Sequence, residues 1–177
     1  MVIEPTLFEN KIFSDPRGLL VDLSAQESIF NFNTKHQCFS LSEPKNTLRG
    51  LHFQSGEYAQ SKIVSCVTGS LIDVVVNIDR SGNDFGKVFY FSLNGLDGNS
   101  VYVPKNCAHG FITTSPNTVV HYSFDSIFWA SSSVTLSFFD PALDVKFPVD
   151  RSEMLISSND QSGLELIAAA EKFETRK

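Results

Sequence analysis

Polar side chains interrupt four segments of the chain that otherwise have the pattern of buried strands, and these side chains are of types that move protons. The segments are 48–54, 60–62, 103–111 and 119–122. They supply His52, Lys62, His109 and Tyr122. Histidine titrates near neutral pH, and a lysine can stabilise a negatively charged oxygen. The four segments therefore predict a site for acid–base chemistry.

His52 is the first candidate for a general base. Apolar Leu51 and Phe53 flank it, so we expect it in or near the core. A buried histidine can simply be hydrogen-bonded to the backbone, which is the alternative for His52 taken alone. Arg49 lies three residues earlier, and in a straight strand the two side chains would face opposite sides. Gly50 permits a bend that brings them together, which favours the general base.

The other three candidates also have structural interpretations. Lys62 could lie at the rim of a sheet with its stem against apolar side chains, or beside a developing oxyanion. His109 stands before a glycine, and taken alone it is typical of a structural histidine in a turn. Tyr122 alternates with Val120 and Phe124, so the three share one face of a strand. Tyr122 could be a core tyrosine with a satisfied hydroxyl, or it could deliver a proton.

Short strands separated by turn signals must position these side chains. Aromatic and β-branched residues, including 16 Phe, favour pleated, half-buried surfaces. Two strands are expected at 62–67 and 70–78, joined by a tight turn at Thr68-Gly69. Further strands are expected at 87–93, 100–103, 110–114, 118–124 and 134–138. Many short strands at this spacing predict an all-β sandwich or barrel.

Helical signals lie mainly near the ends of the chain. Residues 26–30 are compatible with a helical turn, and residues 163–173 have the apolar spacing of an amphipathic helix. Segment 140–150 contains Pro141 and Pro148, which predicts a loop. The chain has 177 residues, of which 42% are hydrophobic and 19% charged, with no internal repeat and no long linker. This predicts one folded domain over residues 1–177.

Charge and cysteine content argue against several functional classes. The net charge of -6 argues against a nucleic-acid-binding protein, although local cations could still bind an anionic small molecule. Cys38, Cys66 and Cys107 are odd in number, widely spaced and without a CxxC pair. They predict a reducing, cytoplasmic location and no disulfide framework or structural zinc site. The first residues lack the pattern of a secretory signal, and no apolar stretch approaches the roughly 20 residues that span a bilayer.

The polar segments also form a series of motifs in a fixed order. The series is Asp15-Pro-Arg-Gly, Leu48-Arg-Gly-Leu-His-Phe-Gln, Gln60-Ser-Lys, Gly69-Ser-Leu-Ile-Asp, and Tyr102-Val-Pro followed by Ala108-His-Gly-Phe. From residue 13 to about residue 160, the series resembles the dTDP-4-dehydrorhamnose 3,5-epimerase family. The resemblance implies a jelly-roll β-barrel of the cupin type with short helices near both ends. It also implies a homodimer that works without a metal or an organic cofactor.

The resemblance implies a role for each matching residue. His52 would be the catalytic base, and Asp160 would orient it. Lys62 would stabilise an enolate, and Tyr122 would return a proton from the opposite face. The residues that would contact the nucleotide sugar or line its pocket are Arg17, Asp22, Gln37, Arg49, His109 and Phe128. The implied reaction is epimerisation at C3, C5 or both of a nucleotide-linked 4-keto-6-deoxy sugar, in the biosynthesis of deoxysugars and surface polysaccharides.

The second position of a metal-binding motif is altered. Metal-binding cupins carry a His-x-His pair, a following glutamate and a later histidine. Gln54 stands where the second histidine of the pair would be, so His52, Glu57 and His109 remain at best. This set falls short of a well-held catalytic metal site, and we predict that no metal is bound.

Several residues depart from the family pattern. Phe128 stands in place of a second tyrosine, Phe39 in place of an asparagine, Asp22 in place of a glutamate and Asn159 in place of a basic residue. The serine-rich stretch that begins at Ala130 replaces a Pro-Glu-x-Glu stretch. The nucleotide, the sugar and the number of inverted centres therefore stay open. The alternatives are a single-centre epimerase, another isomerase such as a 3,4-ketoisomerase on the same barrel, and a non-catalytic module that binds nucleotide sugars.

Overall fold

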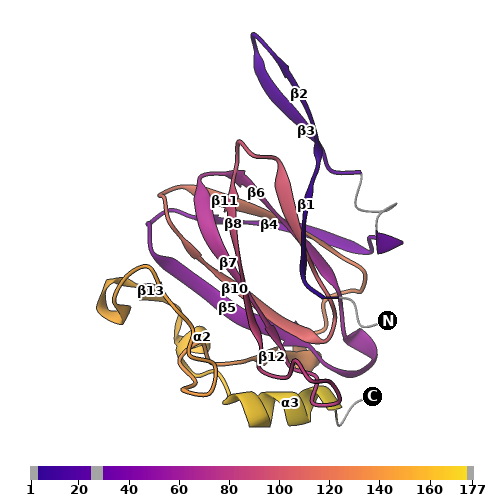
Figure 1. Cartoon of the computed structure of the whole chain (residues 1–177), viewed down its shortest axis with the longest axis vertical. Coiled ribbons are helices and arrows are strands. Elements are labelled where there is room, and N and C mark those ends of the chain that lie inside the picture. The colour runs from indigo at the N-terminus through magenta and orange to yellow at the C-terminus, as the bar shows by residue number, and fades with distance from the viewer. Residues whose placement is uncertain (1–3, 25–29, 175–177) are drawn as a thin grey trace.

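The chain folds into two facing β-sheets, which a computed structural model describes over residues 4–24 and 30–174 (Figure 1). The sheet that carries Tyr122, here the β11 sheet, has the order β1-β9-β6-β11-β4. Its strands are β1 (Thr6–Glu9), β9 (Asn99–Val103), β6 (Lys62–Thr68), β11 (Thr118–Phe124) and β4 (His36–Ser42).

The sheet that carries His52, here the β5 sheet, has the order β12-β5-β10-β7-β8, and β13 also pairs with β5. Its strands are β12 (Ser133–Thr135), β5 (Thr47–Gln54), β10 (Cys107–Thr113), β7 (Ser70–Asn77), β8 (Val88–Asn94) and β13 (Leu155–Ile156). Neighbouring strands are mostly far apart in the sequence, and all pairs except β13–β5 are antiparallel. This is the arrangement of a jelly-roll barrel, and the predicted all-β class is confirmed.

Short elements lie outside the two sheets. A hairpin of β2 (Lys11–Asp15) and β3 (Gly18–Asp22) projects away from the barrel, as Figure 1 shows at the top. The 3-10 turns are η1 (Gly56–Tyr58), η2 (Ala130–Ser132) and η3 (Arg151–Glu153), and the helices are α2 (Ser158–Gln161) and α3 (Leu166–Glu174). No helix in the part of the chain that the structure describes is long and apolar enough to cross a membrane.

Most expected elements are found, with shifted ends. The expected strand 118–124 coincides with β11, and the turn between β6 and β7 lies at Gly69, where φ is +78°. The expected strand 134–138 is wrong beyond Thr135, because Ser137 instead bonds to Leu164. The expected helix 163–173 begins later, at Leu166. The expected helical turn at 26–30 lies largely outside the described residues.

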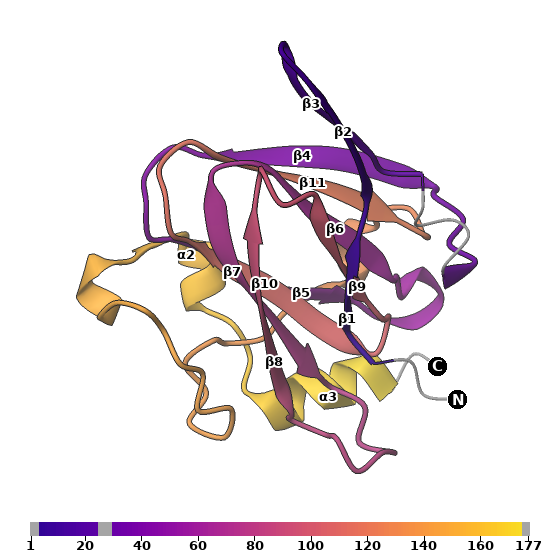
Figure 2. The ribbon, with the colours of Figure 1, turned by 45° about the horizontal axis from the view of Figure 1, so that its top comes forward.

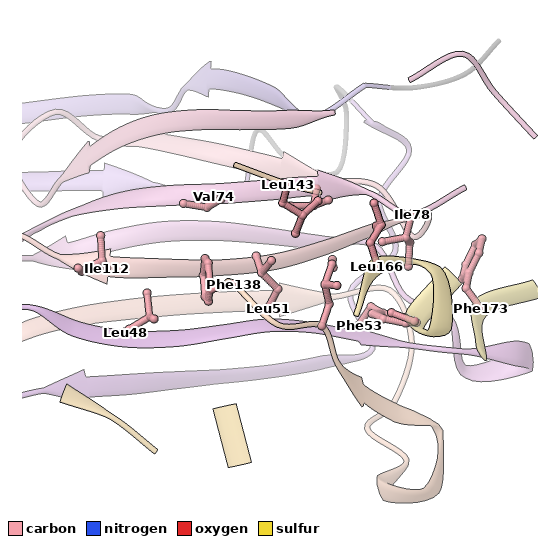
Figure 3. Close-up of a cluster of buried hydrophobic side chains, with 14 residues drawn as sticks. Leu48, Leu51, Phe53, Val74, Ile78, Ile112, Phe138, Leu143, Leu166 and Phe173 are labelled. Atoms are coloured by element: carbon pink, nitrogen blue, oxygen red, sulfur yellow. The ribbon is translucent and has the colours of Figure 1, made fainter. Parts of the chain in front are cut away.

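Two of the three hydrophobic clusters in the described residues pack against the β5 sheet. One cluster lies on the side of the β5 sheet that faces away from the β11 sheet, where α3 packs (Figures 2 and 3). There Leu51 and Phe53 of β5 meet Leu166 and Phe173 of α3. The other cluster fills the space between the sheets with Val64, Val75, Val101, Phe111 and Val120, among others. Adjacent residues of β5 therefore point to opposite sides of the sheet. Leu51 and Phe53 pack on the side where α3 lies, whereas His52 faces the space between the two sheets.

A close approach of β5 to β10 bends the strand that carries His52. Gly50 has a φ of +109°, and a Cβ placed there would lie 2.6 Å from the Cα of Gly110. The register between β10 and β5 shifts at the same place, between His109 and Phe111. The bend that Gly50 was expected to permit is therefore present, and it turns Arg49 and His52 toward the same cavity.

Alanine at this bend should destabilise the protein. Gly50→Ala combines a backbone conformation that disfavours side chains with a clash against Gly110, so we expect a loss of about 2–5 kcal/mol in the free energy of unfolding. Gly82→Ala is the control, since a Cβ there meets nothing within 4 Å and the change should alter stability by less than about 1 kcal/mol. Denaturant unfolding of both variants measures the difference. Equal midpoints would show that the close approach is not a tight constraint.

Candidate active site

A cavity of about 490 Å³ opens between the two sheets. Both sheets contribute side chains to it, together with the segment after β11 and helix α2. The polar side chains among its lining are those of His36, Cys38, Ser40, Arg49, His52, Gln54, Gln60, Lys62, His109, Tyr122, Ser133, Asn159 and Asp160. All four residues first singled out from the sequence, His52, Lys62, His109 and Tyr122, lie in this cavity.

His52 is held by a carboxylate that comes from more than 100 residues later in the chain. The Nε2 atom of His52 lies 2.7 Å from Oδ1 of Asp160, which is the third residue of α2. The cap of this short helix also fixes Asp160, since its backbone N–H donates to the Ser157 hydroxyl. Burial alone would raise the pKa of Asp160, but hydrogen bonds from His52 and Ser157 outweigh it and hold the pKa below its usual value. Asp160 is therefore ionised at neutral pH and orients the imidazole.

Lys62 is a buried cation beside His52. It begins β6 on the opposite sheet and is only 6% exposed. Its Nζ donates to the backbone carbonyl of His52 over 3.1 Å. Burial lowers the pKa of Lys62 to about 8, although the nearby Asp73 carboxylate acts in the opposite direction. Lys62 is therefore mostly charged at neutral pH, with its ammonium directed into the cavity, and a surface position for it is ruled out.

Tyr122 faces His52 from the opposite sheet. Its ring lies between those of His109 and Phe124, with centroid distances of 6.4 Å and 5.9 Å. Its hydroxyl lies 3.3 Å from the Ser40 hydroxyl on the neighbouring strand β4. Burial raises the pKa of Tyr122 well above its ordinary value, so the phenol carries its proton at neutral pH. Tyr122 is thus a protonated phenol in a fixed position, on the opposite side of the cavity from the His52 imidazole.

A second histidine–carboxylate pair lies directly beside the first. His109 and His52 are register partners on β10 and β5, and the Nε2 of His109 lies 2.7 Å from Oδ1 of Asp73. Both members of this second pair are buried, and burial lowers the pKa of His109 despite the carboxylate. His109 is therefore neutral and donates its Nε2–H to Asp73. It lies inside β10, so its assignment to a turn is wrong.

Arg49 links the two sheets at the rim of the cavity. Its Nε donates to the Ser42 hydroxyl over 3.0 Å, and its Nη2 donates to the Leu41 carbonyl over 3.1 Å. Both partners belong to β4, at the edge of the β11 sheet. A guanidinium can still present its remaining N–H groups to an anion. Arg49 therefore lines the cavity with N–H groups to spare, and its contact with a ligand stays a prediction.

Three predicted contact residues lie outside this cavity. Arg17 is at the tip of the β2–β3 hairpin, where its guanidinium pairs with Asp15 over 2.5 Å. Asp22 ends the same hairpin and accepts a hydrogen bond from the Ser24 N–H. Gln37 points to the outer face of the β11 sheet, because its neighbour Cys38 faces the cavity and strand residues alternate. In a single chain these three residues cannot join His52, so their contact with a ligand stays a prediction for an assembly.

The sequence did not single out every polar residue of the site. Asp73 is missed, although a carboxylate inside the apolar run of β7 is itself a signal, since buried charges are usually paired. Ser40 carries no such signal, because serine is common at exposed strand positions and its contact with Tyr122 joins two distant segments. Phe128 lines the cavity as predicted, from the loop after β11. Asn159, a departure from the family pattern, lines the cavity next to Asp160.

No metal cluster is found among the described residues: no three His, Cys, Asp or Glu side chains are grouped so that they could hold an ion. The amide of Gln54 instead bonds to the backbone of neighbouring loops. What the cavity offers is an imidazole with its carboxylate on one wall, a phenol on the opposite wall and an ammonium beside them. This set can take a proton from one face of a small molecule, stabilise negative charge and return a proton to the other face.

Comparison with known proteins supports the same chemistry. The family model described as dTDP-4-dehydrorhamnose 3,5-epimerase matches residues 2–167. The chain belongs to this family. The predicted family, and with it an isomerase of the epimerase type, is confirmed. The dTDP-4-dehydrorhamnose 3,5-epimerase of Salmonella typhimurium is 31% identical over 146 residues, 80% of each chain. That of Shigella flexneri is 30% identical over 168 residues, 92% of this chain and 91% of the relative.

Solved structures of the family share the fold. The crystal structure of dTDP-6-deoxy-D-glucose-3,5-epimerase from Legionella pneumophila, in complex with dTDP-4-keto-L-rhamnose, superposes with a TM-score of 0.89 at 28% identity. The match covers 97% of this chain and 93% of that chain. The epimerase of Mycobacterium tuberculosis gives a TM-score of 0.88 at 27% identity, over 97% and 90% of the two chains. The predicted cupin jelly roll of the dTDP-4-dehydrorhamnose 3,5-epimerase family is thereby confirmed.

Proposed function

We propose that this protein epimerises C3, C5 or both centres of a nucleotide-linked 4-keto-6-deoxy sugar, in the biosynthesis of deoxysugars and surface polysaccharides. The observation that carries the proposal is that His52 of the β5 sheet, paired with Asp160 of α2, and Tyr122 of the β11 sheet line one shared cavity. The Legionella relative, solved with dTDP-4-keto-L-rhamnose, supports this class of substrate. The whole of residues 1–177 acts as one catalytic domain in this proposal.

The reaction follows from the acidity of the carbons beside the ketone. His52 removes the proton from C3 or C5, and the electron pair of the broken C–H bond moves to the carbonyl oxygen, which gives an enolate. The Lys62 ammonium stabilises that oxyanion, and Asp160 stabilises the imidazolium that forms. Tyr122 then donates its proton to the carbon from the other face, which inverts the centre. Exchange with solvent restores the proton of Tyr122 and removes the one held by His52.

Residues around this set bind the substrate. Arg49, at the cavity rim, contacts the phosphates, and neutral His109 forms the floor beside the sugar. Phe128 contacts the ligand at the mouth. No step in the proposed mechanism needs a metal or an organic cofactor, and the absence of one stays a prediction. The cytoplasmic location predicted from the cysteines, all three of which are unpaired, also stays a prediction.

In a homodimer, the three contact residues outside the cavity, Arg17, Asp22 and Gln37, could reach the ligand. The outer face of the β11 sheet exposes Phe39, Leu41 and Val67 by 73%, 46% and 54%. Four apolar side chains of the β2–β3 hairpin are also exposed, namely Ile12, Phe13, Leu19 and Leu20. Exposed apolar side chains that gather on a sheet face and on a projecting hairpin support a protein interface. A projecting hairpin could then carry Arg17 and Asp22 to the partner's cavity, with Gln37 at the interface.

The test is incubation of the protein with a panel of nucleotide-linked 4-keto-6-deoxy sugars in heavy water, followed by NMR. Incorporation of deuterium at C3 or C5, with inverted coupling patterns, is the expected result, and it should be the same after dialysis against a chelator. Labelling at other carbons would indicate a different isomerase. Binding without any labelling would indicate a non-catalytic module.

The pH dependence of kcat/KM should report the ionisation of Lys62. Because burial lowers the pKa of Lys62 to about 8, its charge is lost as the pH rises through that value, so kcat/KM should fall above about pH 8. The Asp73 carboxylate favours the charged lysine, so Asp73→Asn should move this alkaline limb to lower pH. Asp144→Asn, an exposed carboxylate paired with Lys146, is the control and should leave the limb in place. An alkaline limb that does not move in Asp73→Asn would contradict the role of Lys62.

Removal of the proton donor should separate solvent exchange of the acidic protons from inversion of configuration at the same carbons. In Tyr122→Phe, His52 can still remove a proton and return a deuteron to the same face, so exchange should remain measurable while inversion at one or more carbons falls by about 10²-fold or more. Tyr90→Phe, whose hydroxyl bonds to the backbone of Lys146 away from the cavity, is the control. NMR coupling constants of the product report each configuration. An unchanged inversion rate in Tyr122→Phe would place the donor elsewhere.

A charge on the apolar face should break the dimer. Phe39→Glu places a carboxylate on the outer face of the β11 sheet, where burial against a partner would desolvate it. We expect wild-type protein to sediment as a dimer and Phe39→Glu to shift toward the monomer, with a raised KM because the hairpin of the partner is lost. Wild-type protein that sediments as a monomer at micromolar concentration would contradict the assembly.

A further inference from the structure

Gln54 joins the strand of the catalytic base to the mouth of the cavity. It is the last residue of β5, two positions after His52, and it is only 4% exposed. Its Nε2 donates to the carbonyls of Tyr58 and Ile127, each over 2.9 Å, and its Oε1 accepts from the Trp129 N–H over 2.7 Å. One buried amide therefore satisfies three backbone groups from two segments.

The two segments meet beside the cavity. One is the turn η1 with Tyr58, and the other is the stretch 127–129 after β11. The rings of Tyr58 and Trp129 stack over each other, with centroids 5.1 Å apart and planes 11° apart. Between the two bonded backbone groups of the second segment lies Phe128, whose ring lines the cavity.

Apart from the stacking of Trp129 on Tyr58, the side chains of the second segment are largely open to solvent. Ile127, Phe128 and Trp129 are exposed by 50%, 59% and 48%. A segment with half-exposed side chains depends on its backbone hydrogen bonds for a fixed position. Two of the three bonds of Gln54 go to this segment, one on each side of Phe128, so Gln54 ties both sides of Phe128 to the barrel.

We infer that Gln54 is a positioning residue that fixes Phe128 at the mouth of the cavity, and so sets the affinity for substrate without taking part in proton transfer. The inference rests on the proposed function, because it assigns to Gln54 the shape of the ligand-contacting mouth. The His52–Asp160 bond and the Lys62 contact with the His52 carbonyl do not involve the Gln54 amide. Loss of that amide should therefore weaken the fixed position of Phe128 and leave proton transfer by His52 unchanged.

Gln54→Met tests this assignment, because it keeps the length of the side chain and removes all three bonds. KM should rise about tenfold or more, while the rate of solvent exchange at saturating substrate stays within about threefold of wild type. Trp129 is the only tryptophan of the chain, so its fluorescence reports on the same segment without any substrate. In Gln54→Met the emission should shift to the red and become easier to quench with acrylamide.

A double-mutant cycle tests the route through Phe128. If Gln54 acts by positioning that ring, Phe128→Ala should raise KM by itself, and Gln54→Met should add little to it. Gln161→Met is the matched control, since that side chain bonds to the Ile156 carbonyl outside the cavity, and it should change neither KM nor the fluorescence.

If Gln54→Met does not fold, Gln54→Glu keeps the acceptor for Trp129, removes both donors and should change KM and fluorescence in the same direction.

Three results would overturn the inference. One is an unchanged KM and an unchanged Trp129 emission in Gln54→Met. Another is a loss of exchange at saturating substrate with KM preserved, which would make Gln54 a support of the base. The third is full additivity with Phe128→Ala. If wild-type protein labels no sugar of the panel, the proposed function fails, whereas the fluorescence of Gln54→Met still decides whether Gln54 holds the segment.

Discussion

The site depends on the contact between two glycines, Gly50 of β5 and Gly110 of β10. Their backbones approach so closely that no side chain fits at either position. The approach bends β5, and the bend lets one strand place Arg49 and His52 in the cavity while Leu51 and Phe53 fill the core outside the sheet. Without the bend, alternation along the strand would send either the arginine or the histidine to the wrong layer. Catalytic geometry and core packing are thus set by the same feature.

Charge balance is the second condition for the chemistry. Lys62 is a buried cation, and Asp73 is a buried carboxylate near it that also holds His109. A buried ammonium is stable only with such a partner, because the protein interior solvates charge poorly. His52 and His109 are cross-strand neighbours, yet each has its own carboxylate. The deeper imidazole is kept neutral by burial, which leaves the half-exposed His52 to meet the substrate.

Much of the fold and of the inner site could be predicted from the sequence, for physical reasons. Strands such as β6, β7 and β11 alternate or run apolar between turn signals, and His52, Lys62 and Tyr122 stand out because they interrupt that pattern. The hairpin β2–β3 was not predicted, because its apolar residues face no core of their own chain. The bonds of Gln54 and the contact between Ser40 and Tyr122 join distant segments, and no local pattern records them. Arg17, Asp22 and Gln37 were expected in the pocket from the family motif, but a single chain keeps them outside it.

Solvent exchange by His52→Asn tests directly whether His52 removes the acidic proton from the face opposite Tyr122. Asparagine keeps a polar side chain near Asp160 but has no basic nitrogen. The variant and wild type would be incubated with a 4-keto-6-deoxy sugar nucleotide in heavy water, and the label at C3 and C5 followed by NMR. We predict that exchange falls by about 10²–10⁴-fold at both carbons while the melting temperature stays near that of wild type. Retention of a tenth or more of the wild-type exchange rate would show that another group is the base.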